Sequence, residues 1–378
     1  MRWFRRGGRV LFVFILIYSF LLSIKLIGKG AHFLGEDFAR KLISTTSDPF
    51  IGIFIGILVT VLAQSSSLTT SLVVALVGAG TLNINCAIPI IMGANIGTTV
   101  TNTLVSLGHI SWRIEFRRAF QAATVHDFFN LLTVIILFPL QLRFGYLTKI
   151  SLFFENVFEG IGGVRFTSPL KIALHPVVSL FKRIFLDYFS LPEKLGGALF
   201  ILLGLILLFS SLLFLVRLLR RLFIGKAEVL IDKYIFKNNF ITMGLGFFIT
   251  AIVQSSSLTT SIMVPLAAAG VLSLEKVFIY TMGANVGTTF TALLASLAIV
   301  GEGRSSALAV ALAHLFFNLS GIIMFYPFKK IRRMPVILAR RLALFCYRRR
   351  YFSLVYVLIV FIILPLIFIL IRKILILN

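Results

Sequence analysis

Charged residues are scarce in this sequence, and acidic residues are the scarcest. Of 378 residues, only 13% are charged, and 13 Asp and Glu stand against 37 Lys and Arg, a formal net charge of +24. A typical soluble domain has about 25% charged and about 45–50% apolar residues. This chain is 59% hydrophobic with a mean hydropathy of +1.02. The composition excludes an ordinary soluble fold and predicts an all-α polytopic membrane protein embedded in a lipid bilayer.

Cysteine is nearly absent, since Cys86 and Cys346 are the only two. Two isolated cysteines give neither a disulfide framework nor a metal-binding spacing, so we expect no bound cofactor. In a soluble protein the basic surplus would favour a nucleic-acid partner. Here the basic residues gather mainly at the ends of apolar stretches, so we expect no nucleic acid and interpret most of the charge as a signal of membrane topology.

Seven apolar stretches are long enough to cross a bilayer, which requires about 20 residues for about 30 Å of hydrocarbon. The first follows four arginines in the manner of a signal peptide, but no small-residue cleavage site comes after it. We therefore expect a retained transmembrane helix. The predicted spans are residues 10–28, 84–107, 119–140, 195–216, 277–299, 307–328 and 351–370.

Two further apolar stretches, 49–80 and 239–270, are each interrupted by the octapeptide Gln-Ser-Ser-Ser-Leu-Thr-Thr-Ser, at residues 64–71 and 254–261. The arms on either side have about 15 and about 9–13 residues, too few to cross a bilayer at 1.5 Å per residue. Each stretch is therefore predicted to form a re-entrant helical hairpin that turns near mid-depth. Such backbone requires protein or a watery cavity around it.

Three blocks recur in the same order, which indicates an internal duplication. The octapeptides lie 190 residues apart, the block Gly-Ala-Asn-Ile-Gly-Thr-Thr at 93–99 recurs as Gly-Ala-Asn-Val-Gly-Thr-Thr at 283–289, and His126 and Asn130 recur as His314 and Asn318. Cytoplasmic loops carry the excess of Lys and Arg, and placing the basic clusters inside gives the two units opposite orientations. We expect an inverted-topology repeat with its binding site near the midplane.

This topology divides the chain into five parts, and counting spans leaves the C-terminus outside. The parts are an N-terminal transmembrane helix (1–30), a first repeat unit of one hairpin and two spans (45–140), a connector with outer amphipathic helices and one span (141–237), an inverted second unit (238–328), and a basic segment with a C-terminal span (329–378).

The polar blocks contain no charge, since none occurs between Asp48 and Arg113 or between Lys237 and Glu275. Hydroxyl and carbonyl oxygens suit Na⁺, whereas helix N-termini and hydroxyl donors suit an anion. Two structural alternatives remain open: Ser and Thr can bond to their own helix, and the glycine-containing blocks can serve close helix packing.

One acid, Asp127, falls well inside a predicted span, where it is a functional candidate by default; pairing with Arg117 or Arg118 is the alternative. We expect the histidines to hydrogen-bond to neighbouring helices. The residues considered for ion coupling or for supporting the site are Asp127, His126, Asn130, His314 and Asn318.

At these motifs the chain resembles the type II sodium-dependent phosphate cotransporters, over roughly residues 45–140 and 238–328. The resemblance rests on the paired Gln-Ser-Ser-Ser blocks, the glycine-containing block with Thr-Asn-Thr after it, and the run from Glu115 to Asp127. It implies phosphate binding by Gln64, Ser65, Ser66, Ser67, Gln254, Ser255, Ser256 and Ser257. It implies sodium binding by Thr69, Thr70, Asn95, Thr98, Thr99, Thr259, Thr260, Asn285, Thr288 and Thr289.

The resulting hypothesis is secondary active symport of inorganic phosphate with Na⁺, by alternating access, in the plasma membrane, which in a bacterium is the inner membrane. Na⁺ is then the coupling ion, and the chain is not an enzyme. An anion channel or a transporter of another oxyanion is the alternative. A serine hydrolase using Ser65, Ser66 or Ser67 with His126 leaves the exact duplication without a reason. Stoichiometry, electrogenicity and oligomeric state stay open.

Overall fold

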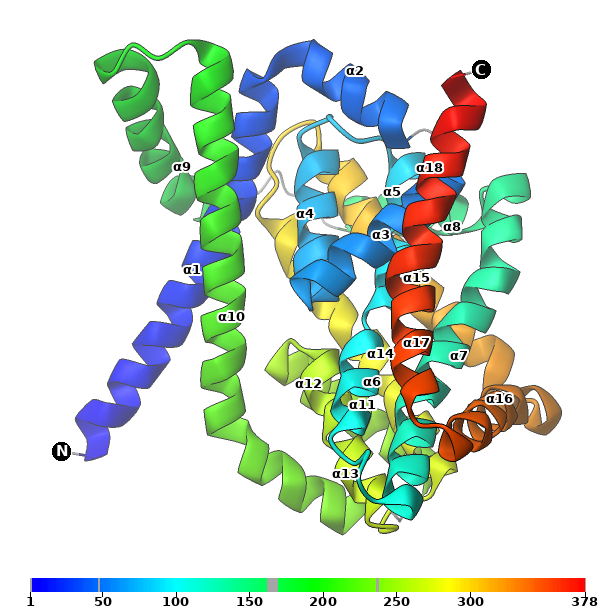
Figure 1. Ribbon diagram of the computed structural model, residues 1–378. Helices are drawn as coiled ribbons and strands as arrows, with labels where there is room; N and C mark the ends of the chain where they lie inside the picture. Colours follow the sequence, from blue (N-terminus) through cyan, green and yellow to red (C-terminus); the bar gives the residue numbers. More distant parts are fainter. Residues whose placement is uncertain (1, 47, 162–168, 236–237, 378) are drawn as a thin grey trace.

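The computed structural model describes residues 2–46, 48–161, 169–235 and 238–377, and every regular element in those ranges is helical (Figure 1). The prediction of an all-α protein is confirmed. The first half contains α1 (Arg2–Phe33), α2 (Gly35–Thr46), α3 (Pro49–Ala63), α4 (Ser66–Gly78), α5 (Ile84–Gly97), α6 (Val100–Leu107), α7 (Arg113–Phe144), α8 (Tyr146–Ile161), α9 (Pro169–Lys182) and the π-helix η1 (Arg183–Tyr188). The second half contains α10 (Glu193–Tyr234), α11 (Asn239–Val253), α12 (Ser256–Ser261), α13 (Met263–Ala268), α14 (Leu274–Leu297), α15 (Arg304–Phe325), α16 (Lys329–Arg348), α17 (Tyr351–Leu358), the π-helix η2 (Ile359–Ile363) and α18 (Leu364–Leu377).

Among the described residues, seven helical segments are long and apolar enough to span a membrane, and they coincide with the seven predicted spans. They run over Leu11–Phe33, Ile84–Leu107, Arg113–Phe144, Glu193–Leu219, Leu274–Leu297, Arg304–Phe325 and Tyr351–Leu375. The chain is therefore a multi-pass membrane protein. Between α7 and α10, where amphipathic helices were predicted, the structure has α8, α9 and η1.

Each predicted hairpin is a pair of short apolar arms, broken inside the octapeptide. The arm α3 ends at Ala63 and α11 ends at Val253, and the next residues, Gln64 and Gln254, are left-handed with φ of 51° and 60°. An L-residue rarely adopts this conformation, and it cannot continue a right-handed helix. Figure 1 places α3 and α4 in the half of the molecule nearer α2, and α11 to α13 in the half nearer α16.

The helix that follows each hairpin crosses the first arm at backbone contact distance. The crossings α3/α5 and α11/α14 are built from glycines at matching positions. A Cβ on Gly93 would lie 1.9 Å from the Ile53 carbonyl oxygen, and one on Gly283 would lie 1.9 Å from that of Met243. The alternative that the glycine-containing blocks serve close helix packing is therefore correct for Gly93 and Gly283.

The two units differ in where their helices break. The span after the first hairpin is divided into α5 and α6 around Thr98 and Thr99, whereas α14 is continuous. The N–H of Thr99 bonds the carbonyl of Ile96, three residues back, which tightens the backbone there. In the second unit the break falls instead in the second arm, between α12 and α13. Equivalent segments of the two units thus differ in local conformation.

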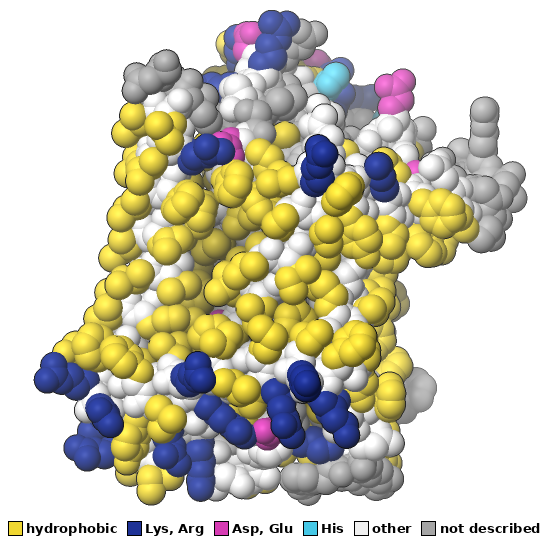
Figure 2. All heavy atoms as spheres, turned by 90° about the vertical axis from the view of Figure 1, so that its right-hand side faces the viewer, with side chains coloured by type: hydrophobic (Ala, Val, Ile, Leu, Met, Phe, Trp, Pro, Cys, Tyr) yellow, Lys and Arg dark blue, Asp and Glu magenta, His cyan; other side chains and the backbone are white. Residues whose placement is uncertain are grey.

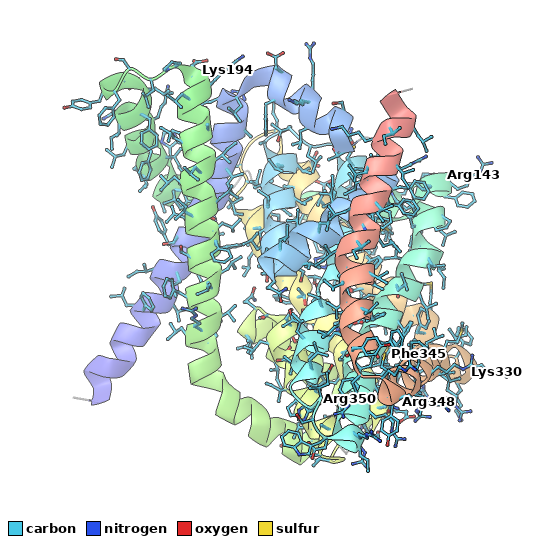
Figure 3. All side chains as sticks on the ribbon, in the orientation of Figure 1. Arg143, Lys194, Lys330, Phe345, Arg348 and Arg350 are labelled. Atoms are coloured by element: carbon cyan, nitrogen blue, oxygen red, sulfur yellow. The ribbon has the colours of Figure 1, made fainter. Side chains whose placement is uncertain are left out.

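Basic side chains occur at both ends of the molecule and gather most densely at one of them. Figure 2 shows a largely hydrophobic surface with a band of Lys and Arg at the end formed by α16. Figure 3 places Lys330, Arg348 and Arg350 at this end, and Arg143 and Lys194 toward the opposite end, which includes α2. We refer to these as the α16 end and the α2 end.

Candidate functional site

The two octapeptides, far apart in the sequence, lie in direct contact. The hydroxyl of Ser67 donates to the backbone carbonyl of Gln254 at 3.3 Å, and the Thr291 hydroxyl of α14 lies 3.4 Å from that of Ser67. Ser257 in turn donates to the carbonyl of Thr98 at 3.4 Å. The predicted phosphate-binding residues of both units therefore meet at one place between the repeats.

The second arm of each hairpin begins with a serine cap. Ser65 precedes α4 and accepts from the N–H of Leu68 at 3.2 Å, and Ser255 precedes α12 and accepts from the N–H of Leu258 at 3.3 Å. Such a cap satisfies one of the free N–H groups of the first turn and leaves others without a helical partner. Each break therefore combines serine hydroxyls with backbone N–H groups that have no helical partner.

The glutamine at each break is held by a threonine from the following span. Thr101 donates to Gln64 Oε1 at 3.0 Å and Thr291 donates to Gln254 Oε1 at 2.6 Å. A second threonine pair joins the two arms of each hairpin, Thr60 with Thr69 at 2.9 Å and Thr250 with Thr259 at 2.6 Å. Four of these threonines were not predicted as site residues. They form two pairs at the repeat offset of 190 residues, Thr60 with Thr250 and Thr101 with Thr291.

The environments of the two glutamines differ. The Gln64 side chain is exposed, whereas Gln254 is only 8% exposed. Both amides donate to their own helix, Gln64 to Val61 and Gln254 to Ala251. The two breaks are thus asymmetric in this conformation: Gln64 is the more exposed glutamine, whereas Ser67 of the first break is buried and Ser257 of the second is half-buried.

The predicted sodium-binding hydroxyls are buried and form hydrogen bonds with backbone carbonyls of the preceding turn. In the glycine-containing blocks, each threonine donates to a carbonyl three or four residues back, at 2.7–3.0 Å. The hydroxyl hydrogen is used by this bond, so the oxygen keeps lone pairs for a cation. These residues are Thr98, Thr99, Thr288 and Thr289. In the octapeptides, Thr70 and Thr260 also bond back to their own helix, and Thr260 additionally contacts Asn102 of α6 at 2.9 Å.

A chain of buried side chains links the two units behind the breaks. His126 of α7 contacts Asn285 Oδ1 of α14 at 2.6 Å through Nε2, and the Asn285 amide donates to Asn130 Oδ1 at 2.7 Å. Asn130 then donates to the carbonyl of Asn95 at 2.6 Å. In the other unit, His314 lies 3.4 Å from Asn95 Oδ1, and Asn318 donates to the His314 carbonyl. The histidines thus bridge neighbouring helices, as their sequence context suggested.

Asp127 is buried next to this network, at 4% exposure. Its Oδ2 accepts from Tyr356 of α17 at 2.9 Å and from Thr103 of α6 at 3.3 Å. Its Oδ1 has no hydrogen-bond partner among the described residues. The alternative of pairing with Arg117 or Arg118 is wrong, because the structure surrounds the carboxylate with hydroxyls instead.

Comparison with known proteins assigns this arrangement to a family. The sequence profile of the Na⁺/Pi-cotransporter family matches residues 19–165 and 206–346, which include both octapeptides and both glycine-containing blocks. The chain belongs to this family. Its members are transporters, and the resemblance noted in the sequence is confirmed.

The curated relatives of this Na⁺/Pi-cotransporter family member are all named sodium-dependent phosphate transport proteins. Sodium-dependent phosphate transport protein 2B of Bos taurus is 32% identical over 450 residues, covering 96% of this chain and 65% of the relative. The 2B protein of Homo sapiens is 32% identical over 449 residues with the same coverage, and the 2A protein of Ovis aries is 34% identical over 435 residues, covering 96% and 68%. The chain thus spans about two thirds of their length. No solved structure matches it significantly.

The family match ends before Tyr356, which donates to Asp127 from outside both repeat units. Nothing in the sequence pointed to this tyrosine, because α17 has no counterpart in the repeat. Asp127 itself has no acidic counterpart, since Leu315 occupies the equivalent position. The one buried carboxylate of the site is therefore a feature of the first unit and of the C-terminal span.

Proposed function

We propose that this member of the Na⁺/Pi-cotransporter family is a secondary active transporter that carries inorganic phosphate with Na⁺ across the plasma membrane by alternating access. The observation that carries the proposal is the contact between the two identical octapeptides, whose surroundings supply hydroxyls, amides and a single buried acid. The names of the curated relatives support the same substrate and coupling ion.

The division of labour in the site follows from charge. Phosphate is held by serine hydroxyls and free N–H groups at the two breaks, since donors at a helix start favour an anion. Na⁺ is held by oxygen atoms, including the carboxylate of Asp127, since it is a hard cation. Bound Na⁺ offsets the phosphate charge in a site whose hairpins contain no basic residue, which gives a physical reason for coupling. We assign phosphate to residues 64–67 and 254–257, and Na⁺ to the predicted threonines and asparagines.

The membrane topology is part of the proposal. We place the α16 end in the cytoplasm because basic residues gather there. The hairpins α3/α4 and α11/α12/α13 then enter from opposite sides and turn at mid-depth, and the units at 45–140 and 238–328 are inverted repeats. The connector at 141–237 carries helices at the outer side. This arrangement provides two related halves between which access can alternate.

Purified protein in proteoliposomes is expected to accumulate ³²P-phosphate when a Na⁺ gradient is imposed, and not when K⁺ replaces Na⁺. Competition by arsenate but not by sulfate is expected for a phosphate site. Uptake that is indifferent to Na⁺ would reject the symport, and equal competition by sulfate would favour a transporter of another oxyanion. Flux that never exceeds electrochemical equilibrium would favour a channel.

Replacing Gln254 by glycine is expected to lower phosphate uptake at least tenfold while changing the melting temperature little. Glycine adopts a φ of 60° without the steric cost borne by glutamine. This gain offsets the lost hydrogen bond from Thr291, typically worth about 1 kcal/mol. A side chain kept in a strained conformation in both units is therefore expected to act in transport. Wild-type uptake by a stable Q254G protein would remove this glutamine from the site.

A further inference from the structure

A basic cavity lies at the α2 end, away from the octapeptides. It has a volume of about 930 Å³ and is bounded by α1, α4, α9 and the loop after α14. Its charged lining consists of Lys25 and Lys29 of α1, Lys182 of α9 and the acidic Glu302, with His32 and His175 beside them. Three lysines against one carboxylate give the cavity a net positive charge.

This concentration of lysines runs against the general trend of membrane proteins. Under the proposed topology the α2 end faces outward, where Lys and Arg are normally few. One of these lysines is also held in position, since the Lys29 ammonium lies 4.8 Å above the Phe33 ring. A concave site whose lining carries a net charge focuses the field and concentrates ions of opposite sign. The occupant that this cavity fits is an anion.

A second cavity occupies the repeat-related position at the α16 end. The first cavity includes Gly80, at the turn after α4, and the second, of about 570 Å³, includes Gly270, at the turn after α13. Both glycines are left-handed, with φ of 71° and 79°. The second cavity is also basic, lined by Arg118, Lys276 and Arg340 with the acidic Glu275. The shared position, marked by Gly80 and Gly270, indicates that both cavities belong to the duplicated architecture, whereas their basic residues come from elements that are not repeat-related.

We propose that the cavity at the α2 end binds a phosphate-class anion, either inorganic phosphate or the phosphate of a lipid headgroup. It is distinct from the octapeptide site: α4 reaches the cavity at Val77 and Gly78, and its other end, at Ser66, lies about 18 Å away at 1.5 Å per residue. Because lysines supply the attraction, binding here is independent of Na⁺. Only one further step rests on the proposed symport, namely that free phosphate bound in this cavity moves on to the octapeptide site. Binding to the cavity does not depend on the symport.

The test measures ³²P-phosphate binding to the full chain in nanodiscs of phosphatidylcholine, with K⁺ in place of Na⁺. The double variant K29Q/K182Q is expected to bind phosphate at least tenfold more weakly than the wild type. The matched control K329Q/K330Q removes the same charge from α16, outside both cavities, and is expected to bind normally. The Gln254→Gly variant is also expected to bind phosphate in the cavity normally although its uptake is impaired. This result would separate binding in the cavity from transport.

A second arm identifies the source of the anion. Nanodiscs that also contain phosphatidylglycerol are analysed by native mass spectrometry for retained lipid. If a headgroup is the natural occupant, the wild type and K329Q/K330Q retain phosphatidylglycerol, K29Q/K182Q does not, and free phosphate competes poorly. Equal phosphate binding and equal lipid retention in the two double variants would overturn the proposal. If uptake by the wild type fails but the Na⁺-independent binding persists, the symport is rejected and the cavity site is not.

Discussion

Replacing Gly246 by alanine is expected to destabilise the protein by at least about 3 kcal/mol, the upper range for overpacking a core. A Cβ on Gly246 would lie 2.1 Å from the carbonyl oxygen of Tyr280 and 3.0 Å from the N–H nitrogen of Ala284. Both atoms are backbone of α14, so no side-chain rotation relieves the clash and the helices must separate. Melting temperature in detergent and the monodisperse yield on size exclusion measure the effect.

The control lies two residues away on the same helix. An ideal Cβ on Gly244 meets no atom within 4 Å. Alanine there is expected to be neutral or to stabilise α11 by up to about 1 kcal/mol, because alanine has the higher helix propensity. Equal melting temperatures for G246A and G244A would show that α11 and α14 do not cross as closely as the structure indicates. The same contrast is not available in α3, because both Gly52 and Gly56 approach α5.

The spans and the breaks could be predicted because both are local properties of the sequence. Seven spans follow from hydropathy over about 20 residues, and the breaks follow from a polar octapeptide between arms too short to cross. The end of α3 at Ala63 and that of α11 at Val253 lie directly before the octapeptides. What the sequence could not supply is the conformation at the break, because nothing in a Gln-Ser-Ser-Ser pattern requires a left-handed glutamine.

The contacts between the units depend on geometry that the sequence does not contain. The repeat offset alone could have identified Thr60 with Thr250 and Thr101 with Thr291, since threonine occupies both positions of each pair. Tyr356 could not be found in this way, because it comes from a helix outside the repeat and meets Asp127 only through tertiary packing. The structure brings predicted residues of both octapeptides into contact, but their hydrogen-bond partners could be found only from the fold.

Sequence identity also conceals the difference between the two halves. The octapeptides are the same, yet Gln64 is exposed and Gln254 is buried. The cause lies in the neighbours, which are not identical: α14 is continuous where α5 and α6 are separate, and Asn102 contacts Thr260 where Ala292 occupies the equivalent position. A transporter that alternates between two accessible sides needs two such environments to exchange. An exact duplication can therefore occupy unequal conformations in any single structure.

Replacing Asp127 by asparagine is expected to weaken activation of phosphate uptake by Na⁺ about 100-fold or to abolish uptake. Within the described part of the chain, Oδ1 of Asp127 has no hydrogen-bond partner, and the groups on Oδ2 are neutral hydroxyls. Burying a carboxylate without a counter-ion costs folding free energy, whereas pairing it with a cation stabilises it by about 3 kcal/mol or more. Loss of that pairing corresponds to about a 100-fold lower affinity for Na⁺. Asparagine keeps the shape and the hydrogen-bonding oxygen while it removes the charge. The Na⁺ dependence of ³²P-phosphate uptake measures the loss.

The melting temperature separates this role from a structural one. Na⁺ binds the folded protein and is expected to raise the melting temperature of the wild type relative to K⁺. D127N is expected to lose that increase, while its stability in K⁺ is unchanged or higher, since an uncompensated buried charge is gone. Y356F removes one hydrogen bond to the carboxylate but leaves its charge, and is expected to weaken Na⁺ activation only about tenfold, consistent with about 1.5 kcal/mol for a hydrogen bond to a charged group. Wild-type Na⁺ dependence in D127N would exclude the carboxylate from the sodium site, and Na⁺ coupling would then rest on the uncharged oxygens alone.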